Sequence, residues 1–151
     1  MKTLLVATAA AATLMASLPA AAQFQRPEDA IKYRKAAFTV MSTHFGRIGA
    51  MVQGRIPYDG AAAALNADIV KEVSVLPFGG FVDGTSGTEK GQPKAIVWTD
   101  RAKFDAAAKK MQDEVAKLAV AAKANSLDTL KAAFGSAAGT CKSCHDEFRN
   151  P

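Results

Sequence analysis

The chain has 151 residues, a length that predicts a single domain. It carries 19 lysines and arginines against 14 aspartates and glutamates, which gives a formal net charge of +5. The basic residues are scattered, without the runs that mark nucleic-acid binding, so we expect no nucleic-acid partner. The mild positive charge would suit an acidic protein partner, and it would equally serve solubility alone.

The N-terminus is typical of a secretory signal peptide. Lys2 is followed by an uncharged apolar run over residues 4–18 and then by Ala20-Ala21-Ala22, a small-residue cleavage site. A membrane anchor is the alternative, but the run is short and rich in alanine, and no stop-transfer pattern follows. We therefore predict that residues 1–22 are cleaved, that residues 23–151 form the mature domain, and that it is exported without a membrane span.

A long amphipathic helix is predicted from Pro27 to about Gly54. Proline suits the first helical position, and Glu28 and Asp29 complement the helix dipole there. Large side chains then recur at spacings of three and four, which indicates one buried stripe. The stripe comprises Ile31, Arg34, Phe38, Met41, Phe45, Ile48 and Val52.

Three more helices follow. The second is capped by Asp59 and stopped by Pro77, with a predicted buried stripe of Ala62, Leu65, Ile69, Val73 and Leu76. The third begins after Thr99 or Asp100 and breaks at Asn125, with Ala102, Phe104, Ala107, Met111, Val115, Leu118 and Ala122 along one side. The fourth is capped by Ser126 and carries Leu127, Leu130, Phe134, Ala138, Cys141 and Phe148.

Between the second and third of these helices lies a glycine-rich stretch of about twenty residues, predicted as a long loop. Such a loop could reach over a cofactor edge or be a tolerated surface insertion. No alternating strand pattern is present. The sequence therefore predicts an all-α, antiparallel up-down four-helix bundle, a fold that places cofactors between facing helices.

Cys141-Lys142-Ser143-Cys144-His145 matches C-x-x-C-H, the pattern of covalent haem attachment. Cysteines three residues apart lie on one face of a helix, so each thiol can add to one vinyl group of the same porphyrin. His145 follows Cys141 by four residues and shares that face, so its imidazole can bind the iron. We predict one haem c, attached through Cys141 and Cys144 near the C-terminus, with His145 as the metal ligand.

Other uses of the two cysteines are less well supported. A disulfide between them would close almost no loop and would stabilise little. A redox-active C-x-x-C pair requires a thioredoxin-like strand before it, and none is predicted. A zinc site requires four ligands, whereas the motif supplies three and the other histidine, His44, is distant in sequence.

The side chain opposite His145 decides between ligand binding and electron transfer. Phe38 lies at the middle of the first-helix stripe and cannot bind iron. Met41, one turn later, has a thioether that could bind it, although methionine more often fills gaps in a core. His44 lies about 240° around the helix from Phe38, so we expect it to face solvent.

These residues resemble the cytochrome c prime family, the class II c-type cytochromes. The resemblance covers the predicted mature chain and is carried by its opening, its first helix and its ending. The matching segments are Gln23-Phe24, Pro27-Glu28-Asp29-Ala30, Lys32-Tyr33-Arg34, His44-Phe45-Gly46-Arg47, Ala132-Ala133-Phe134-Gly135, Cys141-Lys142-Ser143-Cys144-His145-Asp146 and Arg149.

The resemblance implies a periplasmic, high-spin, five-coordinate haem protein that binds NO and CO and discriminates against O₂. It implies that Phe38 occupies the position of an apolar side chain that blocks the distal face, where leucine is common in relatives. It also implies that Arg34 approaches a haem propionate and that Arg149 lies beside the proximal pocket. Arg149 follows His145 by four residues, so on a continuing helix it would share the face of His145. A homodimer formed by the first two helices is a further implication.

Two alternatives remain open at this point. The chain could be a low-spin electron carrier with Met41 as sixth ligand and an unknown redox partner protein. It could also be a haem-free thiol protein. We do not expect an enzyme, because no acid–base pair or nucleophile constellation stands out.

Overall fold

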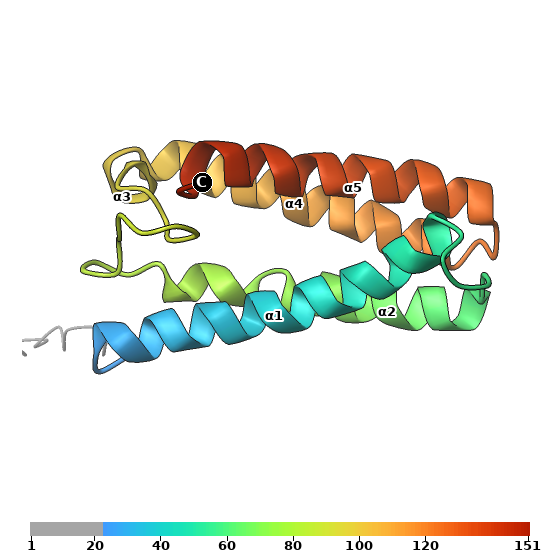
Figure 1. The fold of residues 1–151 in the computed structure, drawn as a ribbon, viewed down its shortest axis with the longest axis horizontal. Helices are drawn as coiled ribbons and strands as arrows, with labels where there is room; N and C mark the ends of the chain where they lie inside the picture. The colour runs from blue at the N-terminus through green and yellow to red at the C-terminus, as the bar shows by residue number, and fades with distance from the viewer. Residues whose placement is uncertain (1–22) are drawn as a thin grey trace, which may run out of the picture.

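The computed structural model describes residues 23–151, and its long helices form an antiparallel four-helix bundle (Figure 1). The predicted fold class is confirmed. The signal peptide predicted for residues 1–22 lies outside the described residues. Among residues 23–151, no helix is both long enough and apolar enough to cross a membrane. The elements in chain order are α1 (Pro27–Val52), α2 (Gly60–Val73), the 3₁₀ helix η1 (Leu76–Gly80), α3 (Ile96–Thr99), α4 (Arg101–Ala122) and α5 (Leu127–Phe148).

Side-chain caps start three of the long helices, as predicted. Asp59 Oδ1 accepts a hydrogen bond from the Ala62 amide at 3.0 Å, and Asp100 Oδ1 accepts one from the Lys103 amide at 3.2 Å. Ser126 Oγ accepts one from the Thr129 amide at 3.3 Å. Each bond satisfies an amide that has no partner within its helix. These local bonds fix where α2, α4 and α5 begin.

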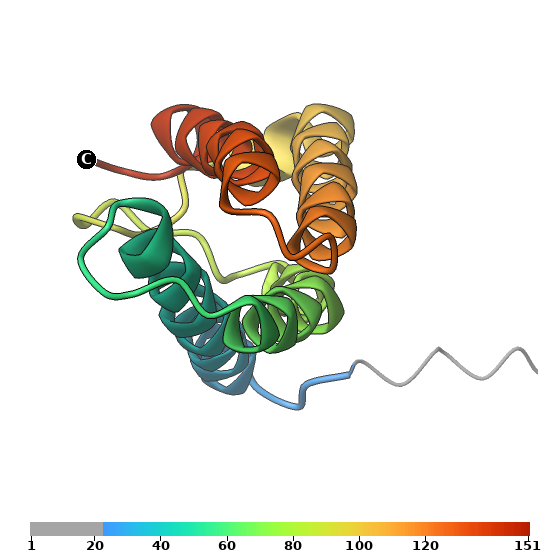
Figure 2. The same cartoon turned by 90° about the vertical axis from the view of Figure 1, so that its right-hand side faces the viewer.

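The bundle consists of two closely packed helix pairs, α1 with α2 and α4 with α5 (Figure 2). The two pairs meet mainly through α2 and α4, whereas α1 and α5 approach one another much less closely. The core between the pairs is filled by aliphatic and small side chains, chiefly Ile48, Met51, Ala63, Ala67, Val70, Met111, Val115, Leu118, Ala119, Ala122, Leu130 and Ala137. Space is therefore left between α1 and the C-terminal half of α5.

The predicted buried face of α2 is wrong. Leu65 is 63% exposed and Leu76 is 42% exposed, whereas the residues buried on α2 are Ala63, Asn66, Ala67 and Val70. Since α2 packs against both α1 and α4, its inner face is made mostly of small side chains that let the neighbouring helices approach. The large side chains of Leu65 and Leu76 lie on the outside. α2 also ends at Val73, and Leu76 and Pro77 belong to η1.

The loop predicted between the second and third long helices contains two short helices, η1 and α3. Its first part packs tightly on α1 at Gly80. A Cβ atom there would lie 2.7 Å from the Ala30 carbonyl oxygen and 2.8 Å from Arg34 Cβ. Its last part pairs with the end of the chain through an isolated antiparallel bridge between Pro93 and Arg149. The segment is thus fastened to α1 at one end and to the end of α5 at the other.

The close approach at Gly80 gives a stability prediction. We expect Gly80→Ala to lower the free energy of unfolding by about 1–3 kcal/mol, because the added methyl group meets backbone that cannot easily move. Gly135→Ala is the matched control, since nothing lies within 4 Å of a Cβ at Gly135 inside α5. The control should be stabilising by up to about 1 kcal/mol through helix propensity. Denaturant unfolding would measure both, and an undiminished stability in Gly80→Ala would contradict the packing described.

Candidate haem site

A cavity of about 690 Å³ lies between α1 and the C-terminal part of α5, with η1 and the following loop along its side. The structure brings every site residue predicted from the sequence to this one cavity. Its lining includes Arg34, Phe38, Met41, Cys141, Cys144, His145 and Arg149. Of the two alternatives left open for the glycine-rich segment, the structure favours the one in which it reaches the site. Five of its residues contribute to the wall: Thr85, Ser86, Gly91, Gln92 and Pro93.

One wall of the cavity comes from the last two turns of α5. Cys141 and Cys144 are half-buried free thiols on the same helix face. Burial raises the pKa of Cys141, and burial followed by the charges of Cys141 and Glu147 raises the pKa of Cys144 to about 11. Redox-active cysteine pairs instead have lowered pKa values. These thiols therefore lack the thiolate character that a dithiol redox site requires.

His145 shares this wall. Partial burial lowers its pKa, and the neighbouring positive charge of Arg149 lowers it further, while Asp146 acts in the opposite direction. The neutral imidazole is the form that binds a metal ion. Within residues 23–151, no three histidine, cysteine, aspartate or glutamate side chains are grouped so that they could hold a metal ion on their own.

The wall from α1 presents large apolar side chains beside polar ones such as Thr39 and Ser42. The Phe38 ring packs edge-on against Phe78 and Phe81, with ring centroids 6.1 and 6.3 Å apart. Met41 also lines the cavity and packs against the bundle core, and Phe45 beyond it stacks on Phe134 at 4.4 Å. Phe38 and Met41 thus both border the space that a cofactor would occupy.

His44 lies outside the cavity, but the prediction that it faces solvent is wrong. It is half-buried against α2, where its Nδ1 forms a hydrogen bond of 2.8 Å with Asn66 Oδ1. Asn66 Nδ2 in turn donates to the Ala62 carbonyl at 2.7 Å. His44 therefore forms part of the interface between α1 and α2.

Arg34 is buried, with only 5% of its surface exposed. Its Nη1 donates to Thr85 Oγ1 at 2.7 Å and to the Gly80 carbonyl at 3.1 Å, and its Nη2 donates to the Thr85 carbonyl at 2.7 Å. Its guanidinium also lies over the Phe81 ring, 4.7 Å from the centroid. Burial lowers its pKa, yet arginine stays charged. All these partners are neutral, so the cavity edge holds a buried positive charge that no acidic side chain among the described residues neutralises.

Arg149 lies at the cavity as predicted, but not on a continuing helix. α5 ends at Phe148, and Arg149 has extended backbone angles of φ −118° and ψ 135°. The residue pairs with the glycine-rich loop, and its Nε donates to the Gly91 carbonyl at 3.2 Å. Its position beside His145 therefore depends on this loop contact.

Sequence reasoning missed an aromatic cluster that forms much of the side wall. Phe81, Phe104 and Phe148 are buried together, with Phe78 and Trp98 packed against them. Phe104 and Phe148 were assigned to helix faces, but Phe78 and Phe81 fall in the segment predicted as loop. Two phenylalanines beside a Gly-Gly pair in such a loop were the available signal that it packs inward.

The cavity fits a haem group on three independent features. Two thiols and an imidazole lie on one wall, the facing wall presents large apolar side chains, and an un-neutralised buried cation lies at the edge. A haem is a large apolar ring with two anionic carboxylates, and it needs these environments. The fold and the site together define a c-type haem protein of the four-helix-bundle class.

Comparison with known proteins gives the family. The family model described as cytochrome C' matches residues 29–149. The chain is 44% identical to cytochrome c′ of Alcaligenes xylosoxydans xylosoxydans over 84% of this chain and 98% of the relative. It is 46% identical to that of Rubrivivax gelatinosus, again over 84% and 98%. The chain belongs to the cytochrome c prime family, and it carries haem c attached through Cys141 and Cys144.

Solved structures of cytochrome c′ have the same fold as this chain. The crystal structure of cytochrome c′ from Rubrivivax gelatinosus superimposes with a TM-score of 0.79 at 45% identity, covering 85% of this chain and all of that one. A nitric oxide complex of a variant of cytochrome c prime from Alcaligenes xylosoxidans superimposes equally well at 43% identity, covering 85% of this chain and 99% of that one. The relatives are named as a haem protein family, not as enzymes.

Proposed function

We propose that this chain is a high-spin, five-coordinate haem protein that binds NO and CO on the face of the iron toward α1. The observation that carries this proposal is the position of Phe38 on the wall of the cavity across from α5. A phenyl ring has no atom that binds iron, so His145 would be the single axial ligand from the chain. When bound, the haem supplies an iron atom that coordinates a diatomic gas.

The side chains deep on the α1 side explain the choice of gas. Phe38, Phe45 and Val70 have no hydrogen-bond donor, and the thioether of Met41 has none either. Two hydroxyls also line the α1 side, but Thr39 Oγ1 donates to the Lys35 carbonyl and Ser42 Oγ donates to the Thr39 carbonyl. Bound O₂ is polar and is stabilised by a donor, whereas NO and CO depend on one much less. The nitric oxide complex of a relative supports NO as a ligand of this chain.

The two arginines would then hold the edges of the cofactor. The buried guanidinium of Arg34 would bind a propionate carboxylate of the haem. The propionate would neutralise this charge, which the neutral partners of Arg34, Gly80 and Thr85, do not. Arg149 would line the space beside His145, held there by Gly91. We propose ligand binding, with one-electron transfer as an accompanying role, in place of catalytic turnover.

A low-spin carrier with Met41 as sixth ligand is the second candidate. Met41 lines the same cavity, one turn from Phe38, so its sulfur lies on the wall from which a sixth ligand would come. The first candidate predicts a high-spin spectrum of the iron and the second a low-spin spectrum. Substitution of Met41 therefore distinguishes them.

We expect Met41→Ala to leave the visible spectra of the oxidised and reduced protein unchanged, because Met41 acts as a packing residue.

Phe38→Ala should keep the high-spin spectrum and accelerate CO binding to the reduced protein by roughly twofold to tenfold. That range follows from about 0.5–1.5 kcal/mol for moving a packed ring off its rotamer. Stopped-flow mixing with CO measures the rates. Low-spin spectra in both oxidation states of the parent protein would contradict the proposal.

Export would deliver the protein to the periplasm, where we place it on the strength of its first 22 residues. We expect the mature protein to begin at Gln23 and to carry the added mass of one haem. Intact-mass measurement of the protein purified from an expressing cell checks both points. A mass that still includes residues 1–22 would contradict cleavage, and an unmodified polypeptide mass would contradict attachment.

A homodimer through α1 and α2 would cover the aliphatic side chains that this face exposes. Val40 is 44% exposed and Leu65 is 63% exposed, and Val75 and Leu76 are also exposed. Several exposed large aliphatic side chains on neighbouring elements favour an interface there. The misassigned face of α2 has a simple explanation here, because its large side chains would be buried by a second copy.

We expect Leu65→Asp to weaken the dimer at least about tenfold, because it places a charge in the apolar contact. Analytical ultracentrifugation measures the dissociation constant. Val120→Asp is the matched control, since Val120 on α4 is 74% exposed and lies on the other helix pair. Equal weakening by both substitutions, or a monomeric parent protein, would refute an interface on α1 and α2.

A further inference from the structure

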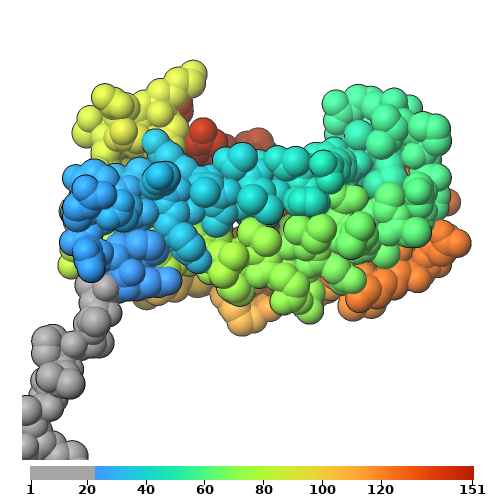
Figure 3. Space-filling model, turned by 90° about the horizontal axis from the view of Figure 1, so that it is seen from below, coloured from blue at the N-terminus to red at the C-terminus, as the bar shows by residue number. Residues whose placement is uncertain are grey.

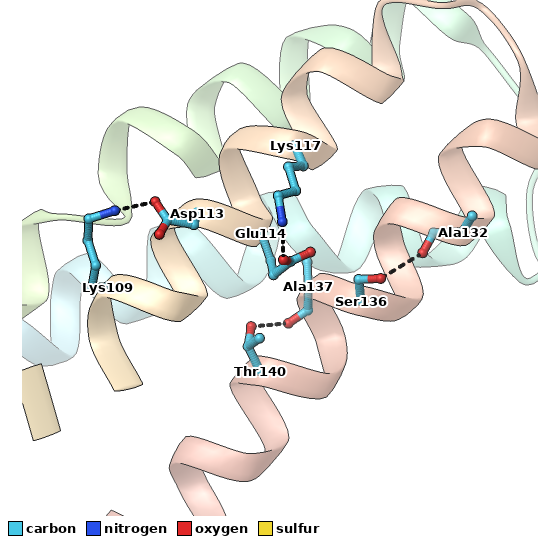
Figure 4. Close-up of polar contacts among 8 residues, drawn as sticks. All are labelled: Lys109, Asp113, Glu114, Lys117, Ala132, Ser136, Ala137 and Thr140. Atoms are coloured by element: carbon cyan, nitrogen blue, oxygen red, sulfur yellow. Dashed lines mark hydrogen bonds and ion pairs between the residues drawn. The ribbon is translucent and has the colours of Figure 1, made fainter. Parts of the chain in front are cut away.

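The lysines and arginines of the described residues fall into two groups, those with an acidic partner and those without one. On α4, two lysines are neutralised by acids of the same helix. Lys109 pairs with Asp113, and Lys117 Nζ lies 2.6 Å from Glu114 Oε1 (Figure 4). Lys123 pairs with Asp68, Lys103 with Glu147, and Lys142 with Asp146. Outside the paired set, the described residues hold ten cations without an acidic partner within 4 Å. They are Lys32, Arg34, Lys35, Arg47, Arg55, Lys90, Lys94, Lys110, Lys131 and Arg149.

Only Lys110 and Lys131 of these ten belong to α4 and the first half of α5. The other eight lie on α1, the turn after it, the glycine-rich loop and the end of α5. From Ala30 to Tyr58 the chain has no aspartate or glutamate at all. In Figure 3 the loop and the C-terminal part of α5 come into view along one edge of α1. Most of the un-neutralised positive charge is therefore carried by α1, the glycine-rich loop and the end of α5.

Four of these cations border the opening of the haem cavity, and we call them the basic rim: Lys35, Lys90, Lys94 and Arg149. Lys35 and Arg149 line the cavity itself. Lys90 and Lys94 line a smaller adjoining hollow of about 440 Å³ that shares His145 and Arg149 with it. The acid at this hollow, Asp146, is already engaged by Lys142.

Two of the four rim side chains, Lys94 and Arg149, are held by contacts that do not cancel their charge. Lys94 Nζ donates to the Asp146 backbone carbonyl at 3.0 Å, and Arg149 Nε donates to the Gly91 carbonyl at 3.2 Å. Both acceptors are neutral. A site whose cations are held in place by neutral acceptors keeps its positive charge and is complementary to an acidic surface. Charge complementarity of this kind raises the rate of association and selects the partner.

We propose that the basic rim is the docking site for an acidic protein that exchanges one electron with the haem through the open side of the cavity. This inference rests on the one-electron role in the proposed function. In the step, the acidic partner in its reduced form loses one electron and the haem iron is reduced from the ferric to the ferrous state, or the reverse. No bond is formed or broken in the chain.

The surface can be mapped directly with poly-L-glutamate as an acidic probe. The haem-loaded protein is labelled briefly with acetic anhydride at low salt, with and without the probe, and each lysine is quantified by mass spectrometry. We expect Lys35, Lys90 and Lys94 to be protected, and Lys110 and Lys131 to be labelled as before. Protection spread evenly, or protection at Lys110 and Lys131, would overturn the proposal. The proposal would also be overturned if phosphatidylglycerol vesicles protected these lysines from labelling and poly-L-glutamate protected none of them.

Electron-transfer kinetics give a second readout. Hexacyanoferrate(III), a trianion, oxidises the ferrous protein by one electron and is itself reduced to hexacyanoferrate(II). At an ionic strength of about 10 mM, Lys35→Gln combined with Lys90→Gln should slow this reaction roughly tenfold, because two charges close to the site of contact are lost. The control, Lys110→Gln combined with Lys131→Gln, removes the same charge at a distance and should stay within about twofold.

A cationic oxidant, tris(phenanthroline)cobalt(III), should react faster with the rim variant than with the parent protein. Redox potentials of all variants are measured so that driving force is excluded as the cause. Equal rates in the rim and control variants would overturn the docking site. The spectrum separates this result from failure of the proposed function, since a high-spin protein with equal rates refutes the docking site alone.

Discussion

The hydrogen bonds of Arg34 are the interactions on which the rest of this site depends. A charged guanidinium is buried in α1, and its partners are a threonine hydroxyl and two backbone carbonyls of the loop. Burying such a charge is costly unless it is hydrogen-bonded and neutralised. The hydrogen bonds fasten the loop over the cavity, and the missing neutralisation is the strongest reason to place an anionic group there. A single side chain thus ties the wall of the site to the chemistry of its occupant.

Local signals predicted most of the fold. The caps at Asp59, Asp100 and Ser126 need only a side chain and an amide three residues later, so the starts of α2, α4 and α5 follow from the sequence. The haem motif is equally local, because five consecutive residues define its helix face. The large side chains of the α1 stripe lie on its inner side as predicted, since Phe38, Met41 and Phe45 line the cavity and Ile48 joins the core.

The predictions that failed depend on contacts distant in sequence. The inner face of α2 is set by two neighbouring helices, which bury Ala63, Asn66, Ala67 and Val70. The hydrophobic periodicity of α2 does not indicate this face, because two of these residues are small and one is polar. The partner of His44 is Asn66, 22 residues away. Arg149 reaches the cavity because residues near Gly91 pair with the end of the chain, and not because α5 continues. In each case the deciding neighbour belongs to another element.

Phe38, which we propose as the barrier on the α1 side of the iron, is in contact with the same cluster that anchors the loop. Phe38 packs on Phe81, and the guanidinium of Arg34 lies over the same Phe81 ring. Any movement of Phe38 that admits a ligand must therefore disturb a ring whose position is also set by the bonds of Arg34 to Thr85 and Gly80. Because packed interiors resist small displacements, the cost of entry is spread over this cluster and is not a property of Phe38 alone. Relatives with leucine in place of Phe38 would have a smaller side chain against Phe81, so the anchoring of the loop and the access of gas are expected to vary together.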